Sequence, residues 1–340
     1  MMDPLKHLQM VKARAAGAVP RKGDLARITA LRDTMPGFDH GVWREMCEKG
    51  WLGLRVPKIA GGSGRGAHRF CRIAEQLGAE LAPEPLITAA MAAQLLPQHQ
   101  LAPVLAGERI ILPAWQENPS SLDPIGNTTF RNGKVSGRKL RIPMAAGADA
   151  FLVTVPDCLA LVERDGPGVS LEIRQTQDGG NIGTLVLENA PAIAIDGDAT
   201  EALEHTIIAT SAYLLGVMNG ALTRTIDYLN THEPPNAEEA RQVTNDLQVQ
   251  VSLTRAAITS GAEALDADTT LSQRQSAVSR AKLRAADSGI VVTRACSQIH
   301  AGVGYALSND IALFLTKATV LAPLYGSSPV HRARWRPAAA

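Results

Sequence analysis

The stretch from Ala199 to Leu229 has two apolar faces, and this pattern constrains the fold more than any other in the chain. One stripe comprises Leu203, Ile207, Thr210, Leu214, Val217 and Ala221. A second stripe comprises Ile208, Ala212, Leu215, Leu222, Ile226 and Leu229. Since a helix with two apolar faces must be covered on both, the pattern predicts a long helix inside a helical bundle. At ~1.5 Å per residue it would span roughly 45 Å before Pro234-Pro235 end it.

The residues that follow predict the rest of this bundle. A second helix over 237–265 would run antiparallel to the first, and a third would end at Ile299. A fourth, short helix is expected after Ser308, because serine is favourable at a helix N-cap. The closing stretch LYGSSPVHRARW is expected to be a loop. Residues 199–340 are therefore predicted to form a C-terminal helical-bundle domain.

The segment that joins the third and fourth helices contains Ala301, Gly302, Val303 and Gly304. Two glycines let a backbone approach a ligand closely, and the start of the next helix adds partial positive charge that favours an anion. A glycine-closed turn between two helices is the alternative interpretation. The segment does not match a dinucleotide-binding fingerprint, because a helix precedes it and that motif requires a strand.

The middle of the chain, over residues 108–198, changes to a β pattern. Runs of Val, Ile, Thr and Leu alternate with turn signals, and GADAFLVTV has the pattern of an interior strand. The turn signals are Asn132-Gly133, Asp165-Gly166 and Asp178-Gly179. Such pairs favour hairpins, since a type I′ turn needs positive φ at both central residues. This middle β domain is therefore predicted to be antiparallel.

Residues 1–107 predict an N-terminal α domain. One helix is expected from about Asp39 to Glu48 and another from about Ala67 to Leu81, with a glycine-rich ordered loop between them. Prolines at 83 and 85 stop the second helix. With helical ends and a β middle, the chain is assigned to the α+β class.

Composition argues against several classes of function. The net charge of +1 gives no basis for nucleic-acid or membrane binding. The 4 cysteines lie far apart, which indicates reduced thiols and a cytoplasmic setting. The 8 histidines are scattered without ligand spacing, so no metal site is expected.

Six stretches, in the same order along the chain, resemble motifs of the acyl-CoA dehydrogenase family. They are GWLGLRVPKIAGGSG, AEQLGAELAPEP, NGKVSGRKLRIPMAAGADAFLV, AYLLGVMNGALTRTIDYL, QIHAGVGYALSNDIAL and GSSPVHR. Each motif alone is weak, but their collinear order over nearly the whole chain is specific. The resemblance implies a helical N-terminal domain, a middle β domain and a C-terminal four-helix bundle.

The resemblance also implies FAD as the cofactor and an acyl-CoA thioester as the substrate. In the family, a carboxylate removes the α-proton while the β-hydrogen leaves as a hydride to the flavin. The positions that would contact the flavin are Trp115, Gln116, Glu117, Arg141, Ile142, Pro143, Ser327 and Ser328. Gln298, Ala301 and Gly302 would contact the ADP part of an FAD that a neighbouring subunit mainly holds.

The chain departs from the family at both positions that carry the catalytic glutamate. The position before the C-terminal Gly-Ser segment is Tyr325, and a phenol with a pKa near 10 is a poor base at neutral pH. The alternative position, ten residues before Gly216, is Thr206. Glu204 lies about half a helical turn from Thr206, so we expect it to be a solvated residue of the first turn, with a role as the base as the alternative.

A second departure follows the first bundle helix. The family's Arg-x-x-Phe-Gly, whose arginine reaches a partner's FAD pyrophosphate, is replaced by His232-Glu233-Pro234-Pro235-Asn236. A histidine at a helix end is more often a partner of the helix dipole than a phosphate ligand. No arginine is left at this position to bind the phosphates.

These departures leave three hypotheses. The chain is one subunit of an FAD-dependent acyl-CoA dehydrogenase, paired with an unlike, base-bearing subunit as in members of bacterial steroid and dicarboxylate catabolism. Alternatively, it is a non-catalytic scaffold of the same fold, or a flavin-dependent monooxygenase that needs no α-proton base. A missing general base costs about 10²–10⁴-fold in rate, which favours the paired arrangement over an autonomous dehydrogenase.

Overall fold

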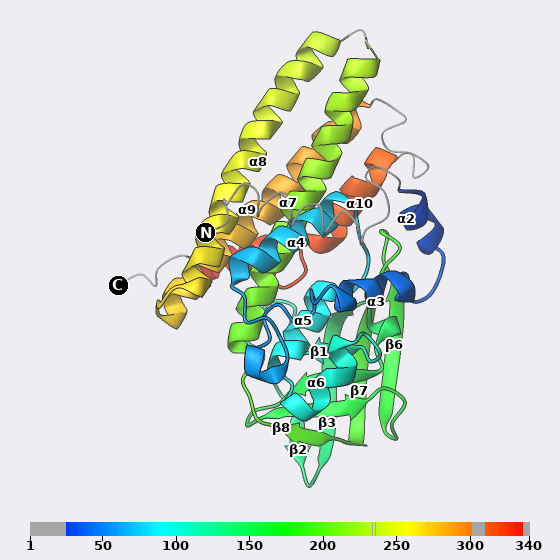
Figure 1. The fold of residues 1–340 in the computed structure, drawn as a ribbon, viewed down its shortest axis with the longest axis vertical. Coiled ribbons are helices and arrows are strands. Elements are labelled where there is room, and N and C mark those ends of the chain that lie inside the picture. Colours follow the sequence, from blue (N-terminus) through cyan, green and yellow to red (C-terminus); the bar gives the residue numbers. More distant parts are fainter. Residues whose placement is uncertain (1–24, 233, 235, 301–309, 336–340) are drawn as a thin grey trace.

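The computed structural model describes residues 25–232, 234, 236–300 and 310–335, and it places a helical part, a β domain and a helical bundle in chain order (Figure 1). The helices are α2 (Ala26–Leu31), α3 (His40–Glu48), α4 (Ala67–Ala79), α5 (Leu86–Leu95), α6 (Gln98–Leu105), α7 (Thr200–Thr231), α8 (Ala237–Asp266), α9 (Leu271–Ile299), α10 (Asp310–Leu321) and α11 (Ser328–Trp335). The strands are β1 (Ile111–Ala114), β2 (Thr129–Arg131), β3 (Lys134–Pro143), β4 (Ala150–Thr154), β5 (Leu159–Glu163), β6 (Val169–Gln175), β7 (Asn181–Pro191) and β8 (Ile193–Ile195). The predicted α+β class is confirmed.

Helices α3 and α4 begin at different kinds of cap. The carboxylate of Asp39 accepts hydrogen bonds from the Gly41 and Val42 amides at the start of α3. Helix α4 is capped from far along the chain, because Asp266 accepts the Ala67 amide at 2.6 Å and the His68 amide at 3.2 Å. The end of α8 is thereby tied to the start of α4.

The β domain consists of two four-stranded sheets, with strand orders β1-β4-β5-β8 and β2-β3-β7-β6. All pairs are antiparallel except β1 with β4, which is parallel. Asn132 and Gly133 have φ of 51° and 73° and join β2 to β3, as the hairpin signal predicts. Asp178-Gly179 joins the paired strands β6 and β7.

The prediction of a hairpin at Asp165-Gly166 is wrong. This turn joins β5 to β6, and these strands belong to different sheets. Strand β5 pairs with β4 and β8, whereas β6 pairs with β7. A turn signal specifies a local reversal of the chain, but the strand that follows is free to pair elsewhere.

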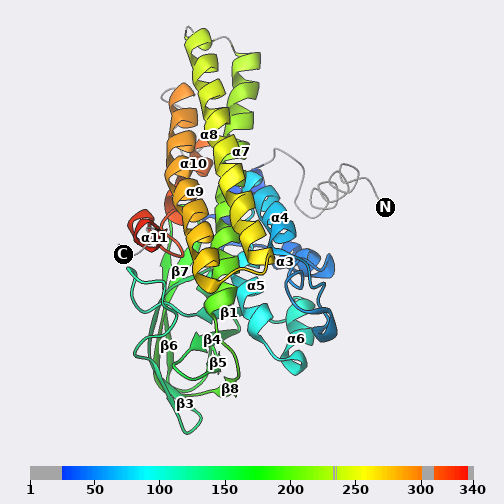
Figure 2. The same cartoon turned by 90° about the vertical axis from the view of Figure 1, so that its left-hand side faces the viewer.

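Helix α7 is the centre of the bundle, and both of its apolar faces are covered. Helices α4 and α5 pack on one side and α8, α9 and α10 on others, with α7 and α8 extending away from the β domain (Figure 2). Among the described residues, α7 is the one helix long and apolar enough to cross a membrane, yet 89% of its most apolar window is buried inside the protein. The predicted two-sided burial is confirmed.

The predicted C-terminal loop is wrong, because residues 328–335 form helix α11. Pro329 stands in its first turn, where a proline costs no helical hydrogen bond. His331 is fully buried, and Ser328 Oγ donates to Asp287 on α9 at 2.6 Å. Packing against α9 therefore stabilises a helix that is too short to form alone. Helix α10 matches the fourth predicted helix, and its expected N-cap, Ser308, lies outside the described residues.

Candidate functional site

A cavity of about 90 Å³ lies where the three parts of the chain meet. Its walls come from α4 and α5 with the turn between them, from β3 and β7 and the turns beside them, and from α7 and α10. The lining residues include Pro83, Ile87, Thr88, Pro143, Thr210, Tyr213, Leu324 and Tyr325. Small-molecule sites usually enclose about 300–1,000 Å³, so this cavity is small for a ligand.

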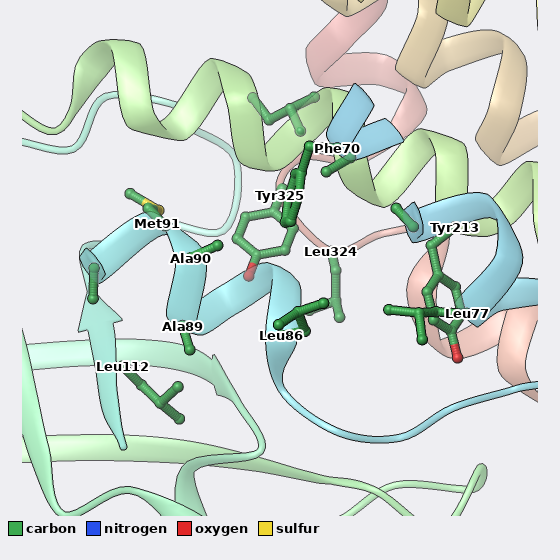
Figure 3. Packing of buried hydrophobic residues seen from close by; sticks show 14 of the residues in the cluster. Phe70, Leu77, Leu86, Ala89, Ala90, Met91, Leu112, Tyr213, Leu324 and Tyr325 are labelled. Atoms are coloured by element: carbon green, nitrogen blue, oxygen red, sulfur yellow. The ribbon is translucent and has the colours of Figure 1, made fainter. Parts of the chain in front are cut away.

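Tyr325 enters this cavity from the turn between α10 and α11, and Figure 3 shows its hydroxyl pointing toward α5. The hydroxyl lies 2.9 Å from Thr88 Oγ1 on α5. The ring stacks with that of Trp115, with centroids 6.3 Å apart and planes inclined by 10°. The residue is only 5% exposed. The side chain at one expected base position is thus fixed within the cavity.

The chemistry of Tyr325 argues against a role as a base. Burial raises the pKa of its phenol to about 12, although the hydrogen bond with Thr88 opposes this shift. The phenol therefore stays protonated near neutral pH. Its backbone has a φ of +56°, a left-handed conformation that costs a bulky residue about 1–3 kcal/mol.

Two carboxylates also line the cavity, and both are held by cations. Glu84 accepts hydrogen bonds from Arg27 at 2.6 and 3.4 Å. Asp178 pairs with Lys317. Burial by itself would raise the pKa of Asp178, but the charge and hydrogen bond of Lys317, with further hydrogen bonds, lower it. The buried Lys317 thus holds Asp178 as an anion, which makes Asp178 a weak proton acceptor.

The alternative base position and its neighbour do not line this cavity. Thr206 is buried and donates to the Ala202 carbonyl on its own helix at 2.8 Å, whereas Thr210, one turn later, does reach the cavity. Glu204 was expected to be solvated, and this is wrong: it is 2% exposed and pairs with Arg334 on α11. Burial raises the pKa of Glu204, while Arg334 opposes that shift.

The segment expected to line a flavin begins directly after β1. Trp115 is 5% and Gln116 4% exposed, and the Gln116 carbonyl accepts the Leu140 amide at 2.7 Å. Burial would raise the pKa of Glu117, but Lys139, Thr128 and the Asn127 amide donate to its carboxylate and lower the pKa to about 2. The carboxylate of Glu117 therefore fixes the loop around Asn127 and Thr128.

The second flavin segment lies at the end of β3. Ile142 is 2% exposed, and Pro143 lines the cavity. Arg141 is exposed and has a φ of +54°. The structure thus brings Pro143 and Tyr325 to one cavity, while Arg141 lies on the surface.

A contact with the ring of His331 stabilises the turn that carries Tyr325. The Tyr325 carbonyl lies 2.8 Å from His331 Nε2, and Ser279 Oγ lies 3.2 Å from the other ring nitrogen. The Ser327 carbonyl accepts the His331 amide, and Ser328 contacts Asp287. Both serines are half-buried, and their hydroxyls do not line the cavity.

The ADP side of the expected cofactor site belongs to residues 296–309, which begin near the end of α9 and are called the hinge below. Gln298 is exposed near the end of α9. Next to it, Tyr228 stacks with His300 at 4.3 Å and with His232 at 4.8 Å between ring centroids. The stack brings together the end of α7 and the end of α9. Ala301 and Gly302 lie outside the described residues.

The resemblance implies a flavin ring between these segments, and the side near Tyr325 does not fit one. A third ring stacked between those of Trp115 and Tyr325 would need about 7 Å, twice a contact of roughly 3.5 Å. The ring centroids are only 6.3 Å apart. The adjoining cavity of about 90 Å³ offers no other space for a tricyclic ring.

Sequence reasoning missed Thr88 and the Asp178–Lys317 pair. Thr88 interrupts the apolar helix LITAAMAAQL, and such an isolated polar residue is a usable signal. The sequence around Asp178 indicates only a turn. Lys317 lies 139 residues away, so no local pattern predicts that the two side chains pair. Within the described ranges, no three His, Cys, Asp or Glu residues are grouped to hold a metal ion.

The sequence matches two domains of known enzymes. Residues 9–99 match the acyl-CoA dehydrogenase N-terminal domain, and residues 197–336 match the acyl-CoA dehydrogenase C-terminal domain. The stretch between these two matches contains the β domain described above.

Individual relatives are identical to this chain at about a quarter of the aligned residues. Acyl-CoA dehydrogenase FadE34 of Mycobacterium tuberculosis is 27% identical over 319 residues, and the match covers 89% of this chain but 44% of FadE34. Benzylmalonyl-CoA dehydrogenase of Aromatoleum aromaticum is 25% identical over 337 residues, with 86% and 87% of the two chains covered. The chain thus spans less than half of the length of FadE34.

Solved structures share the fold over nearly the whole chain. A variant of the Tcur3481-Tcur3483 steroid ACAD has a TM-score of 0.86 and 25% identity, with 97% of this chain and 96% of that chain covered. The ChsE4-ChsE5 complex of Mycobacterium tuberculosis has a TM-score of 0.83 and 21% identity, with 98% and 96% covered. A glutaryl-CoA dehydrogenase of Mycobacterium smegmatis in complex with FADH2 has a TM-score of 0.83 and 17% identity, with 98% and 94% covered.

Proposed function

The chain belongs to the acyl-CoA dehydrogenase family, and from this premise we propose that it is one subunit of a dehydrogenase built from two unlike chains. The unlike partner supplies the proton-accepting carboxylate and the crevice that holds FAD and the acyl-CoA thioester. This chain supplies Gln298, near the end of α9, and Ala301 and Gly302, which follow in the sequence, to the ADP side of the partner's cofactor. It acts as an oxidoreductase component and not as an autonomous dehydrogenase.

The observation that carries this proposal is the state of the cavity beside Tyr325. Glu84 is paired with the partly buried Arg27, Asp178 is paired with the buried Lys317, and Glu204 is turned to Arg334 instead. A general base works best with a pKa near the working pH, and the lowered pKa of Asp178 and the raised pKa of Tyr325 lie on opposite sides of it. Asp178 and Tyr325 therefore both lack the basicity that a proton acceptor needs near neutral pH.

The surroundings of the hinge support its role toward a partner. Gln298 is exposed near the end of α9, so its side chain is accessible to the cofactor of a neighbouring subunit. The neighbouring stack of Tyr228, His232 and His300 holds the ends of α7 and α9 together. The similarity to the ChsE4-ChsE5 complex is in keeping with an assembly of two different chains.

The names of two relatives support a substrate class for the paired enzyme. The Tcur3481-Tcur3483 protein is named as a steroid ACAD, and another relative acts on benzylmalonyl-CoA. Both names describe acyl groups that carry rings. We therefore propose a CoA thioester with a ring-bearing acyl group as the substrate of the paired enzyme.

The pairing is tested by purifying the chain alone and together with dehydrogenase-like chains from neighbouring reading frames. We expect the lone chain to retain little FAD and to show about 10²–10⁴-fold less acyl-CoA-dependent dye reduction than the pair, because the base is missing. Flavin absorbance and dye reduction are the measurements. Full dehydrogenase activity of the lone chain would contradict the proposal.

The hinge contact has its own test in the pair. Replacing Gln298 by alanine removes one hydrogen-bonding side chain from the ADP side, so FAD should bind roughly two- to tenfold more weakly. Arg294→Ala is the matched control, since Arg294 is also exposed and lies one turn earlier on α9. FAD release is followed by flavin fluorescence. Equal FAD affinities of the two variants would remove the hinge from the cofactor site.

A non-catalytic scaffold is the second candidate, and the loss of the family's arginine at His232 favours it. A scaffold would pair with the partner without touching its cofactor. The Gln298→Ala variant separates the two candidates, because a scaffold predicts unchanged FAD affinity in a stable pair.

A further inference from the structure

The strongest unexplained feature is the position of the Tyr325 ring. The reaction of the family requires the substrate's α-carbon beside the base, so the space next to residue 325 is where an acyl group would react. Here that space holds a phenol ring that crosses the cavity from the α10–α11 turn to Thr88 on α5. The ring is larger than the carboxylate side chain that it replaces.

Several contacts fix the ring in this place. Trp115 stacks on it from the β domain, and Thr88 binds its hydroxyl from α5. Behind it, His331 binds the Tyr325 carbonyl at 2.8 Å. Gly326 follows with a φ of +103°, and a Cβ added there would lie 2.5 Å from His331 Nε2. Elements from all three parts of the chain therefore hold one orientation of the tyrosine.

The space that remains beyond the ring is small and mostly apolar. It amounts to about 90 Å³, and Pro85, Ile87 and Leu324 are among its walls. Figure 3 shows Leu86 and Leu324 near one side of the ring and Ala90, on α5, near the other. This space is smaller than the cavity of about 150 Å³ that holds benzene in another protein, so Tyr325 leaves too little room beside it for a ring-sized ligand.

We infer that Tyr325 is a built-in plug that occupies this chain's own acyl crevice in place of a substrate. The crevice as folded admits neither a thioester acyl group nor a flavin ring, and removal of the phenol side chain opens a site for a free phenol. The inference rests on the proposed function only in identifying the crevice as an acyl site.

The test removes the plug and offers its chemical counterpart. Tyr325→Gly suits the positive φ, and p-cresol is the free equivalent of the lost side chain. We expect p-cresol to raise the Tm of this variant in a saturable way, because it binds the folded state, and calorimetry should give one site per chain. Tyr325→Phe is the matched control: it keeps the ring, so neither it nor the wild type should bind p-cresol at this site.

Two results would overturn the inference. One is a folded Tyr325→Gly variant, with native circular dichroism, that p-cresol does not stabilise beyond its effect on the wild type. The other is stoichiometric binding of riboflavin or an acyl-CoA by the lone wild-type chain, which would show an open crevice. This second measurement needs no variant, so it decides the matter even where Tyr325→Gly fails to fold. Failure to find an unlike partner would contradict the proposed function and leave the p-cresol result unaffected.

Discussion

His205 and His331 are histidines buried in a neutral state. They are 3% and 0% exposed. Burial lowers the pKa of each to about 3, with help from the charges of Arg55 for His205 and of Lys282 for His331. Since Nε2 of His331 faces a carbonyl, it carries the proton, and the other nitrogen accepts from Ser279. Protonation of the second ring nitrogen of His331 would remove the acceptor for Ser279 and bury a positive charge.

This burial predicts sensitivity to acid. An unfolded histidine has a pKa near 6.5, so between about pH 6.5 and 3 the unfolded chain binds more protons than the folded one. Stability is therefore present above pH 6.5 and falls as the pH drops toward 3. His331→Gln should flatten this dependence, measured by urea unfolding at several pH values. A pH profile parallel to that of the wild type would contradict the prediction.

Two contacts of single residues could not be predicted from the sequence. Glu204 was expected in solvent, because its position in the first turn of a helix offers no other information. It is buried because Arg334, 130 residues later, reaches it from α11. Thr88 and Tyr325 are 237 residues apart and equally without a local signal.

Among the elements, α4 and α7 approach each other through two glycines. A Cβ on Gly78 would lie 2.0 Å from the Tyr213 carbonyl oxygen, and one on Gly216 would lie 1.9 Å from that of Glu75. Both of these oxygens are backbone atoms, so they cannot avoid an added Cβ by a change of rotamer. The close crossing of the two helices therefore depends on the absence of side chains at both positions.

We predict that Gly78→Ala and Gly216→Ala each destabilise the protein by about 1–3 kcal/mol or more, because α4 and α7 must move apart. Gly289→Ala in α9 is the matched control, since the added methyl would meet only a Leu214 methyl at 3.6 Å. This control should be neutral or stabilise by about 0.4–1 kcal/mol, because alanine restricts the unfolded chain. The free energy of unfolding in urea is the measurement, and equal losses in all three variants would refute the argument.

The elements themselves were largely predictable. The two stripes of α7, the end of α4 before Pro83 and the hairpin at Asn132-Gly133 all follow from neighbours within a few residues. Helix α11 was missed because its sequence is short and polar, and packing on α9 stabilises it. The parallel pairing of β1 with β4 likewise has no turn signal, since the strands are far apart in the chain.

On the scale of the whole molecule, Lys317 and Asp178 tie the bundle to the β domain. Lys317 lies on α10, and Asp178 lies in the turn between β6 and β7. Their side chains are 8% and 6% exposed, so the pair is nearly cut off from water. A charge left unpaired in such a place is costly.

Replacing Lys317 by methionine should therefore destabilise the protein by about 3–5 kcal/mol, because Asp178 stays buried without its cation. The double variant Lys317→Met with Asp178→Asn should recover much of this loss, since no charge is left unpaired. Urea unfolding gives the coupling between the two positions. Additive losses in the double variant would show that the two side chains do not depend on each other.

The sequence by itself determined the order of helical, β and helical parts, because periodicity and turn residues act between near neighbours. It also identified the family, and it predicted that Tyr325 and Thr206 stand at the two positions where the family carries its catalytic glutamate. Only the tertiary structure decided that the Tyr325 hydroxyl meets Thr88 in the cavity, that Arg334 pairs with Glu204 and that Asp266 caps α4. These contacts join residues more than a hundred positions apart, and such pairs come together only when the three parts of the chain pack on one another.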